Sequence, residues 1–211
     1  MNLFFVIIGI ILSSFLIFNN EVPLYLKYFS PFLVLTLVVE LLAINLAKRS
    51  IHTIPLFNFF GIVEFCFYMW VIKNIIKTEK VKIIINYISI ILPIVATLNL
   101  FFYQGINSYN SITYSIGCVS IIFLTIFYFF ELFKLQHAVK LSTDSGFWIC
   151  TALLFFYCVS FPIFVSTNLI KNFPVKLAHI ISLTLLILNV VLYSLFCIAF
   201  LCRIKIRKYF L

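Results

Sequence analysis

The chain has 211 residues, of which 64% are hydrophobic, 19% aromatic and only 10% charged. Roughly a quarter of the residues in a soluble domain are charged, so this composition excludes a soluble protein and indicates that lipid covers most of the surface. The net charge of +9 does not indicate a nucleic-acid partner, because the Lys and Arg residues lie between apolar segments, where they orient membrane proteins and meet anionic headgroups. We expect a single transmembrane domain over residues 1–211, because membrane crossings use up the length.

Seven apolar segments follow one another along the chain, separated by stretches rich in charges, Asn, Ser and Pro. Only helices or closed barrels satisfy the backbone within lipid, and these segments are too long for barrel strands. They therefore predict an all-α, polytopic helical bundle with about seven transmembrane helices. Pro31 and Pro55 are predicted to lie in the first turns of their helices. The predicted helices cover residues 3–18, 31–47, 55–72, 83–103, 112–133, 147–170 and 177–201, followed by a short basic tail at 202–211.

The first of these segments could be mistaken for a signal peptide. It lacks a basic start and a small-residue cleavage site, so we interpret it as a membrane span. It is short, and if it does not insert, six spans remain.

The distribution of basic residues predicts the orientation of the bundle. With the N-terminus outside, the inner connections and the tail hold eleven Lys and Arg residues, and the outer connections hold four. The positive-inside rule therefore predicts an N-out, C-in protein with a basic cytoplasmic tail. We expect a multi-pass protein of the cell membrane, with a bacterial inner membrane as the favoured location.

Two glutamates near the middle of consecutive predicted helices form the strongest candidate site. Glu40 and Glu64 lie at similar depth once the hairpin folds, and an ionisable group at this depth costs roughly 3 kcal/mol. Two facing carboxyls cannot both ionise in a low dielectric, so the pair predicts a proton, cation or ligand site. Tyr68, Asn189 and Tyr193 are expected to contribute to it. The structural alternative is a neutral Glu that locks helices together by hydrogen bonding.

Small and polar residues recur at three- and four-residue spacing in several segments, which predicts faces that pack inward against other helices. These faces supply a secondary polar set formed by Thr36, Ser120, Tyr128 and Glu131. For Glu131 we favour an ion pair with Lys134, three residues further on at the membrane surface, over a role in function.

Pro93 and Pro162 lie in the middle of predicted spans, where proline bends a helix and frees a carbonyl group. They are candidate hinges, although such kinks are common in membrane helices. The sequence contains no nucleophile motif, phosphate-binding loop or histidine pair of the kind that binds metal. We therefore predict no catalytic residues, no metal and no cofactor.

The last helices carry a recurring aromatic pattern. It consists of Phe147, Trp148, Phe156, Tyr157, Phe161 and Pro162, followed by Leu188, Asn189, Leu192 and Tyr193. This pattern resembles the membrane regions of small seven-helix proteins of Bacteroidetes, some of which are fused to a histidine kinase after the last helix. The resemblance implies a sensory or signal-coupling membrane module. This sequence ends at Leu211 without an output domain, so we expect the signal to pass to a separate partner.

Two functions remain open from the sequence. The leading hypothesis is a non-enzymatic, receptor-like module that senses a ligand and couples to a membrane or cytoplasmic signalling partner. The alternative is a small proton- or cation-coupled transporter that uses Glu40 and Glu64. An intramembrane enzyme ranks third, because no nucleophile is paired with a base.

Overall fold

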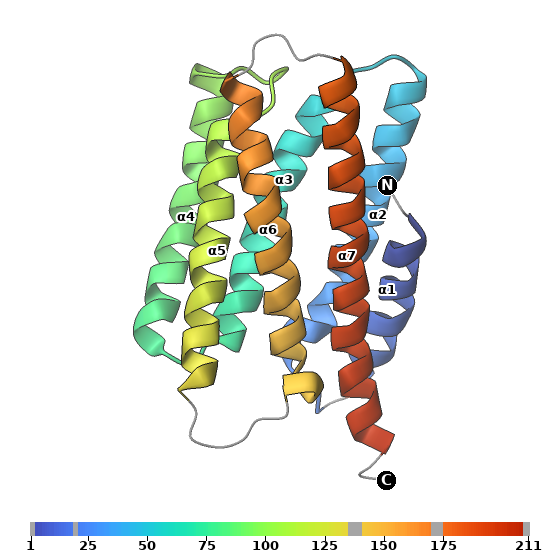
Figure 1. Ribbon diagram of the computed structural model, residues 1–211, viewed down its shortest axis with the longest axis vertical. Helices are drawn as coiled ribbons and strands as arrows, with labels where there is room; N and C mark the ends of the chain where they lie inside the picture. The colour runs from blue at the N-terminus through green and yellow to red at the C-terminus, as the bar shows by residue number, and fades with distance from the viewer. Residues whose placement is uncertain (1–2, 19–20, 135–140, 170–174, 209–211) are drawn as a thin grey trace.

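The computed structural model describes residues 3–18, 21–134, 141–169 and 175–208 (Figure 1). Every regular element within these ranges is helical, which confirms the all-α prediction. The helices are α1 (Leu3–Ile17), α2 (Leu24–Lys48), α3 (Ile54–Ile75), α4 (Glu79–Phe102), α5 (Ser111–Phe133), α6 (Ser145–Leu169) and α7 (Val175–Lys208), with a 3-10 helix, η1 (Leu141–Thr143), before α6.

Helices α2 to α7 are long and apolar enough to cross a bilayer, in agreement with a multi-pass membrane protein. Helix α1 is also apolar, but its 15 residues extend only about 22 Å, less than the roughly 30 Å hydrocarbon core of a bilayer. In Figure 1, α1 covers only part of the height of its neighbours α2 and α7. The described structure therefore contains six full-length candidate spans and one short apolar helix beside them.

Six of the described helices form a closed ring in the order α1, α2, α3, α5, α6 and α7 (Figure 1). Helix α1 packs on α2 and α7, α6 lies between α5 and α7, and α3 contacts α2, α4 and α5. In Figure 1, α3 crosses diagonally behind α6 and α7. Helix α4 packs on the outside against α3 and α5 and buries the smallest share of its length. Helix α3 therefore links α2 to α4 and α5, and its side chains reach α6 and α7 through individual ring contacts such as Tyr68 with Tyr157 and Phe196.

The start of α2 differs from the prediction. Pro55 lies in the first turn of α3, as predicted, but α2 begins at Leu24 and Pro31 lies inside it, so the predicted position of Pro31 is wrong. The extra turns carry Tyr25 and Phe29, both buried against the bundle. This packing holds the segment helical although Pro31 cannot donate a backbone hydrogen bond. Helix α7 in turn continues to Lys208, through much of the predicted tail.

Aromatic side chains fill the core. Phe29 of α2 meets Phe196 and Phe200 of α7 with ring centroids 5.1 and 5.4 Å apart, and Phe32 stacks on Phe67 of α3 at 3.9 Å. Within lipid, helices associate through this kind of close packing, because the lipid chains are as apolar as the side chains they replace. The core therefore fixes α3 against α2 and α7.

Candidate functional site

Glu64 lies in the middle of α3 and is surrounded by tyrosines from four helices. Its carboxyl is within electrostatic range of Tyr68 on the same helix, Tyr114 of α5, Tyr157 of α6 and Tyr193 of α7. Of these four tyrosines, Tyr68 and Tyr193 were expected to contribute to the site of the glutamate pair, whereas Tyr114 was not. The structure therefore brings three of the predicted site residues, Glu64, Tyr68 and Tyr193, into one region.

Three buried hydroxyl groups in this region have no hydrogen-bond partner among the described residues. They belong to Tyr68, Tyr157 and Ser160, and all three residues are fully buried. The Tyr68 hydroxyl lies beside the Glu64 carboxyl but outside hydrogen-bonding geometry. An unpaired buried hydroxyl costs about 1–3 kcal/mol, and native structures contain few such groups. These three hydroxyls are therefore the candidate ligand contacts of this region.

Ser160 joins the tyrosines because it follows Tyr157 by three residues and so lies on the same face of α6. It also lies next to Cys118 of α5, which is itself within electrostatic range of Glu64. We use the name Glu64 cluster for the residues Glu64, Tyr68, Tyr114, Cys118, Tyr157, Ser160 and Tyr193.

Aromatic rings hold the Glu64 cluster in place. Phe65 packs against Tyr114 and Tyr157 with centroid distances of 4.9 and 5.5 Å. Phe196 of α7 lies 6.1 Å from Tyr68. The described Lys and Arg residues all lie near helix ends or in connections, far along the chain from Glu64. The carboxyl is therefore in an apolar, aromatic environment, and no basic side chain of the described ranges pairs with it.

Glu40 lies at the edge of this cluster. It lies on α2, partly buried, within electrostatic range of Glu64 and Tyr193. Neither glutamate side chain forms a hydrogen bond within the described part of the chain. Two other predicted contributors bond to their own helices: Thr36 donates to the Phe32 carbonyl at 3.0 Å, and Asn189 donates to the Leu185 carbonyl at 2.8 Å. The polar groups of these two side chains are satisfied without the cluster.

The expected ion pair of Glu131 with Lys134 is wrong for the described structure. Glu131 instead accepts hydrogen bonds from the backbone N–H groups of Lys77 and Thr78, at 2.9 and 2.8 Å, and from the Thr78 hydroxyl at 2.7 Å. Thr78 is the N-cap of α4, where N–H groups lack partners within the helix and favour a negative charge. Glu131 of α5 therefore clamps the turn between α3 and α4.

The other members of the secondary polar set form separate hydrogen bonds and do not make one site. Tyr128 donates to the carboxylate of Asp144 at 2.8 Å, and Asp144 also accepts from the Gly146 N–H at the start of α6. Ser120 donates to the Ile116 carbonyl of its own helix. The sequence analysis did not include Asp144, although an Asp directly before an apolar segment is a typical helix N-cap.

A polar hollow lies at the end of the bundle where α3 meets α4. We call it the Glu131 hollow. Its empty volume is about 750 Å³ including its opening, and it is lined by Tyr25, Asn74, Ile75, Lys77, Tyr128, Glu131, Leu132, Asp144 and Gly146. Arg203, in the last turns of α7, is within electrostatic range of Tyr25. This end of the bundle thus combines basic side chains with two carboxylates.

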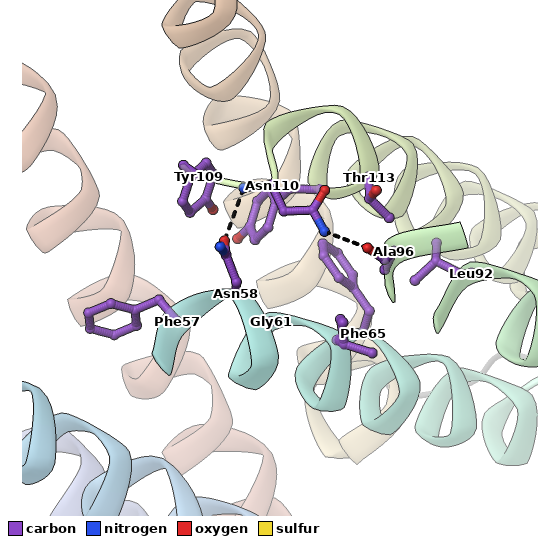
Figure 2. Close-up of a pocket in the computed structure, with 11 residues that line it drawn as sticks. Phe57, Asn58, Gly61, Phe65, Leu92, Ala96, Tyr109, Asn110 and Thr113 are labelled. Carbon is purple, nitrogen blue, oxygen red and sulfur yellow. Dashed lines mark hydrogen bonds between the residues drawn. The ribbon is translucent and has the colours of Figure 1, made fainter. Parts of the chain in front are cut away.

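A second, smaller hollow lies between α3, α4 and α5 at the opposite end (Figure 2). We call it the Asn58 hollow, and its empty volume is about 290 Å³ including its opening. Asn58 accepts a hydrogen bond from the Asn110 N–H at 3.0 Å, and the Asn110 side chain donates to the Ala96 carbonyl at 3.1 Å, as the dashed lines in Figure 2 show. These amides tie the connection before α5 to its neighbours.

The Asn58 hollow reaches the Glu64 cluster along α3. Gly61 and Phe65, which lie on either side of Glu64 in the sequence, both line the hollow, and so does Tyr114 of the cluster. Asn58 and Asn110 were missed as structural residues, although Asn58, an Asn within an apolar segment, was an available signal.

The chain matches no protein-family model, no curated protein and no solved structure.

Proposed function

We propose that this protein is a non-enzymatic, receptor-like membrane module that binds a small ligand at the Glu64 cluster and couples to a separate signalling partner. The observation that carries the proposal is that the fully buried hydroxyls of Tyr68 and Tyr157, both within electrostatic range of Glu64, and of Ser160, one turn from Tyr157, have no partner among the described residues. Convergent polar groups in an apolar surround are typical of small-ligand sites. Ionisable residues within spanning helices are functional candidates by default.

Helix α3 offers a direct mechanical path from the cluster to one end of the bundle. Eleven residues separate Glu64 from Ile75, the last residue of α3, which corresponds to about 17 Å along the axis. Directly after α3, Lys77 and Thr78 are held by Glu131. A shift of α3 on ligand binding would change this clamp and the Glu131 hollow beside it. The Glu64 cluster and the Glu131 clamp would then be coupled, because both contact α3, a rigid helix that would move between two positions.

The proposed partner binds at the end of the bundle that contains the Glu131 hollow. With the N-out, C-in orientation that the basic residues favour, this end faces the cytoplasm of a bacterial inner membrane. The aromatic pattern of α6 and α7, which resembles the sensor regions fused to histidine kinases, is compatible with a kinase-like partner.

Hydrogen–deuterium exchange tests this coupling. The protein in lipid nanodiscs is mixed in turn with ammonium, potassium, urea and acetate, and exchange is followed in peptides that contain Lys77 and Thr78. We expect at least one probe to change exchange there in the parent and in the exposed control Glu79→Gln, but not in Glu64→Gln. The proposal is wrong if no probe acts, or if Glu64→Gln responds like the parent.

The second candidate function is a proton- or cation-coupled transporter. It is favoured by the electrostatic proximity of Glu40 to Glu64 and by the presence of hollows toward both ends of α3. In proteoliposomes, Glu64→Gln and Glu40→Gln should then abolish cation-driven flux while the protein remains folded. Absence of flux in the parent, or unchanged flux in both variants, would exclude transport.

A further inference from the structure

We infer that the Glu64 cluster binds a small ammonium group, carried by the ammonium ion or by a short primary amine. The inference rests on the proposed function, because it names the ligand of the same site. Four features of the cluster lead to it: its charge, its acceptors, its aromatic faces and its size.

The charge of the site requires a cation or a proton. Glu64 is the one acidic residue of the cluster, and the described basic side chains lie near helix ends or in connections. An ionised carboxylate in an apolar environment is costly unless a partner neutralises it. Glu40 is within electrostatic range of Glu64, and two carboxyls that share one proton leave a single negative charge, which a monovalent cation matches better than a divalent metal ion.

The acceptors of the site match the donors of an ammonium group. The hydroxyl oxygens of Tyr68, Tyr157 and Ser160 have no partner in the described structure, and each can accept a hydrogen bond. A primary ammonium group presents three N–H donors, and the ammonium ion presents four. The three hydroxyls and the Glu64 carboxylate supply four acceptors from α3 and α6. An alkali cation has no directional donors and would not use this arrangement selectively.

The aromatic rings supply a further attraction that is specific for cations. The rings of Tyr68 and Tyr157 lie 6.2 Å apart at an interplanar angle of 74°, and Phe65 lies 5.5 Å from Tyr157. Aromatic faces attract a desolvated ammonium group by about 2 kcal/mol. Such rings repel an anion and give a neutral amide no comparable gain.

The size of the approach limits the ligand. The Asn58 hollow, which shares Tyr114 with the cluster, has about 20 Å³ of space for water-sized groups, far below the roughly 300–1,000 Å³ of pockets for drug-sized molecules. A methyl group at Gly61 would be 3.8 Å from the Tyr114 ring, so the wall beside the cluster is already in near contact. The space beside the cluster therefore suits a ligand of about the size of a water molecule and not a bulky one.

Calorimetric titration of the folded protein in nanodiscs tests the inference, with ammonium, methylammonium, potassium and tetramethylammonium chlorides at constant ionic strength. We expect ammonium and methylammonium to bind at least tenfold more tightly than potassium or tetramethylammonium. Tyr157→Phe and Ser160→Ala should each weaken ammonium binding by about tenfold, the effect of one hydrogen bond to a charged group. The control Tyr103→Phe, an exposed tyrosine outside the cluster, should leave binding unchanged.

The outcomes separate the inference from the proposed function. If potassium or tetramethylammonium binds as tightly as ammonium and Glu64→Gln abolishes this binding, the ammonium inference is wrong and the ligand site stands. If no cation binds, the ammonium inference is wrong, and the exchange response to urea or acetate decides whether the ligand site stands. If Glu64→Gln binds ammonium like the parent, both are wrong. Should Glu64→Gln fail to fold, Tyr157→Phe and Ser160→Ala decide the question, because the hydroxyls they remove support no hydrogen bond in the described structure.

Discussion

Tyr68 of α3 and Tyr157 of α6 meet edge to face, with ring centroids 6.2 Å apart, and neither hydroxyl has a hydrogen-bond partner in the described ranges. This pair lies near Glu64, where side chains of α6 and α7 contact α3. Two phenol rings that pack well but whose buried hydroxyls form no hydrogen bond lower the stability of the ligand-free protein. The same hydroxyls are available to hydrogen-bond a ligand.

Removal of the Tyr157 hydroxyl should not destabilise the ligand-free protein. Tyr157→Phe eliminates an unpaired buried oxygen, so we expect the free energy of unfolding to rise by about 1–3 kcal/mol. The matched control is Tyr128→Phe, which breaks a bond to the Asp144 carboxylate and should lower this free energy by about 1.5–3 kcal/mol. Unfolding in a denaturing detergent series measures both. Equal losses in the two variants would show that Tyr157 is bonded within the protein.

Loss of the Glu131 carboxylate should open the turn between α3 and α4. Glu131→Ala leaves the Lys77 and Thr78 N–H groups without their acceptor, so we expect a loss of about 2–3 kcal/mol and faster amide exchange at both residues. Lys134→Ala is the control, and it should change stability by less than about 0.5 kcal/mol. A larger effect of Lys134→Ala than of Glu131→Ala would restore the ion pair predicted from sequence.

Glycine at position 117 permits the contact between α3 and α5. A methyl group there would lie 2.7 Å from ring atoms of Phe65, whereas a methyl group at Gly61 would meet Tyr114 at 3.8 Å, an ordinary contact. We expect Gly117→Ala to cost about 1–3 kcal/mol through overpacking, and Gly61→Ala to be tolerated. Thermal unfolding in nanodiscs distinguishes them, and equal stability of the two variants would contradict the packing described for Phe65.

The amide of Asn58 should be needed for the connection before α5. Asn58→Ala removes bonds to the Ile106 and Ser108 carbonyls and from the Asn110 N–H. We expect faster exchange over residues 104–111 and a loss of about 2 kcal/mol. Asn74→Ala, which affects an exposed side chain bonded to its own helix, is the matched control. Unchanged exchange over residues 104–111 in Asn58→Ala would exclude this role.

The sequence predicts the helical class, most helix positions and the location of Glu64, because apolar length and a buried charge are local signals. It does not predict that α2 starts at Leu24, since proline normally begins a helix and here packing of the preceding turns carries the helix through Pro31. The function of Glu131 was also missed, because its partners are backbone groups 53 and 54 residues away. Their approach depends on how α3, α4 and α5 pack.

The Glu64 cluster could be predicted from the sequence only in part. Glu64, Tyr68 and Tyr193 could be selected from the sequence as interior polar residues. Glu40, which lies at the same predicted depth as Glu64, is within electrostatic range of it but does not contact it through a hydrogen bond in the described structure. Depth along a helix is readable from sequence, whereas rotation about its axis depends on tertiary packing. The packing of the helices brings Tyr157 of α6, as well as Glu40 of α2, within electrostatic range of Glu64.

A structure determined in lipid nanodiscs with ammonium chloride present tests the central claim most directly. We predict density for a bound group in contact with the Glu64 carboxyl and the hydroxyls of Tyr68 and Tyr157, and its loss in Glu64→Gln. If the three hydroxyls of Tyr68, Tyr157 and Ser160 instead bond to other protein groups and no density lies between them, the cluster is a structural lock and the account is wrong.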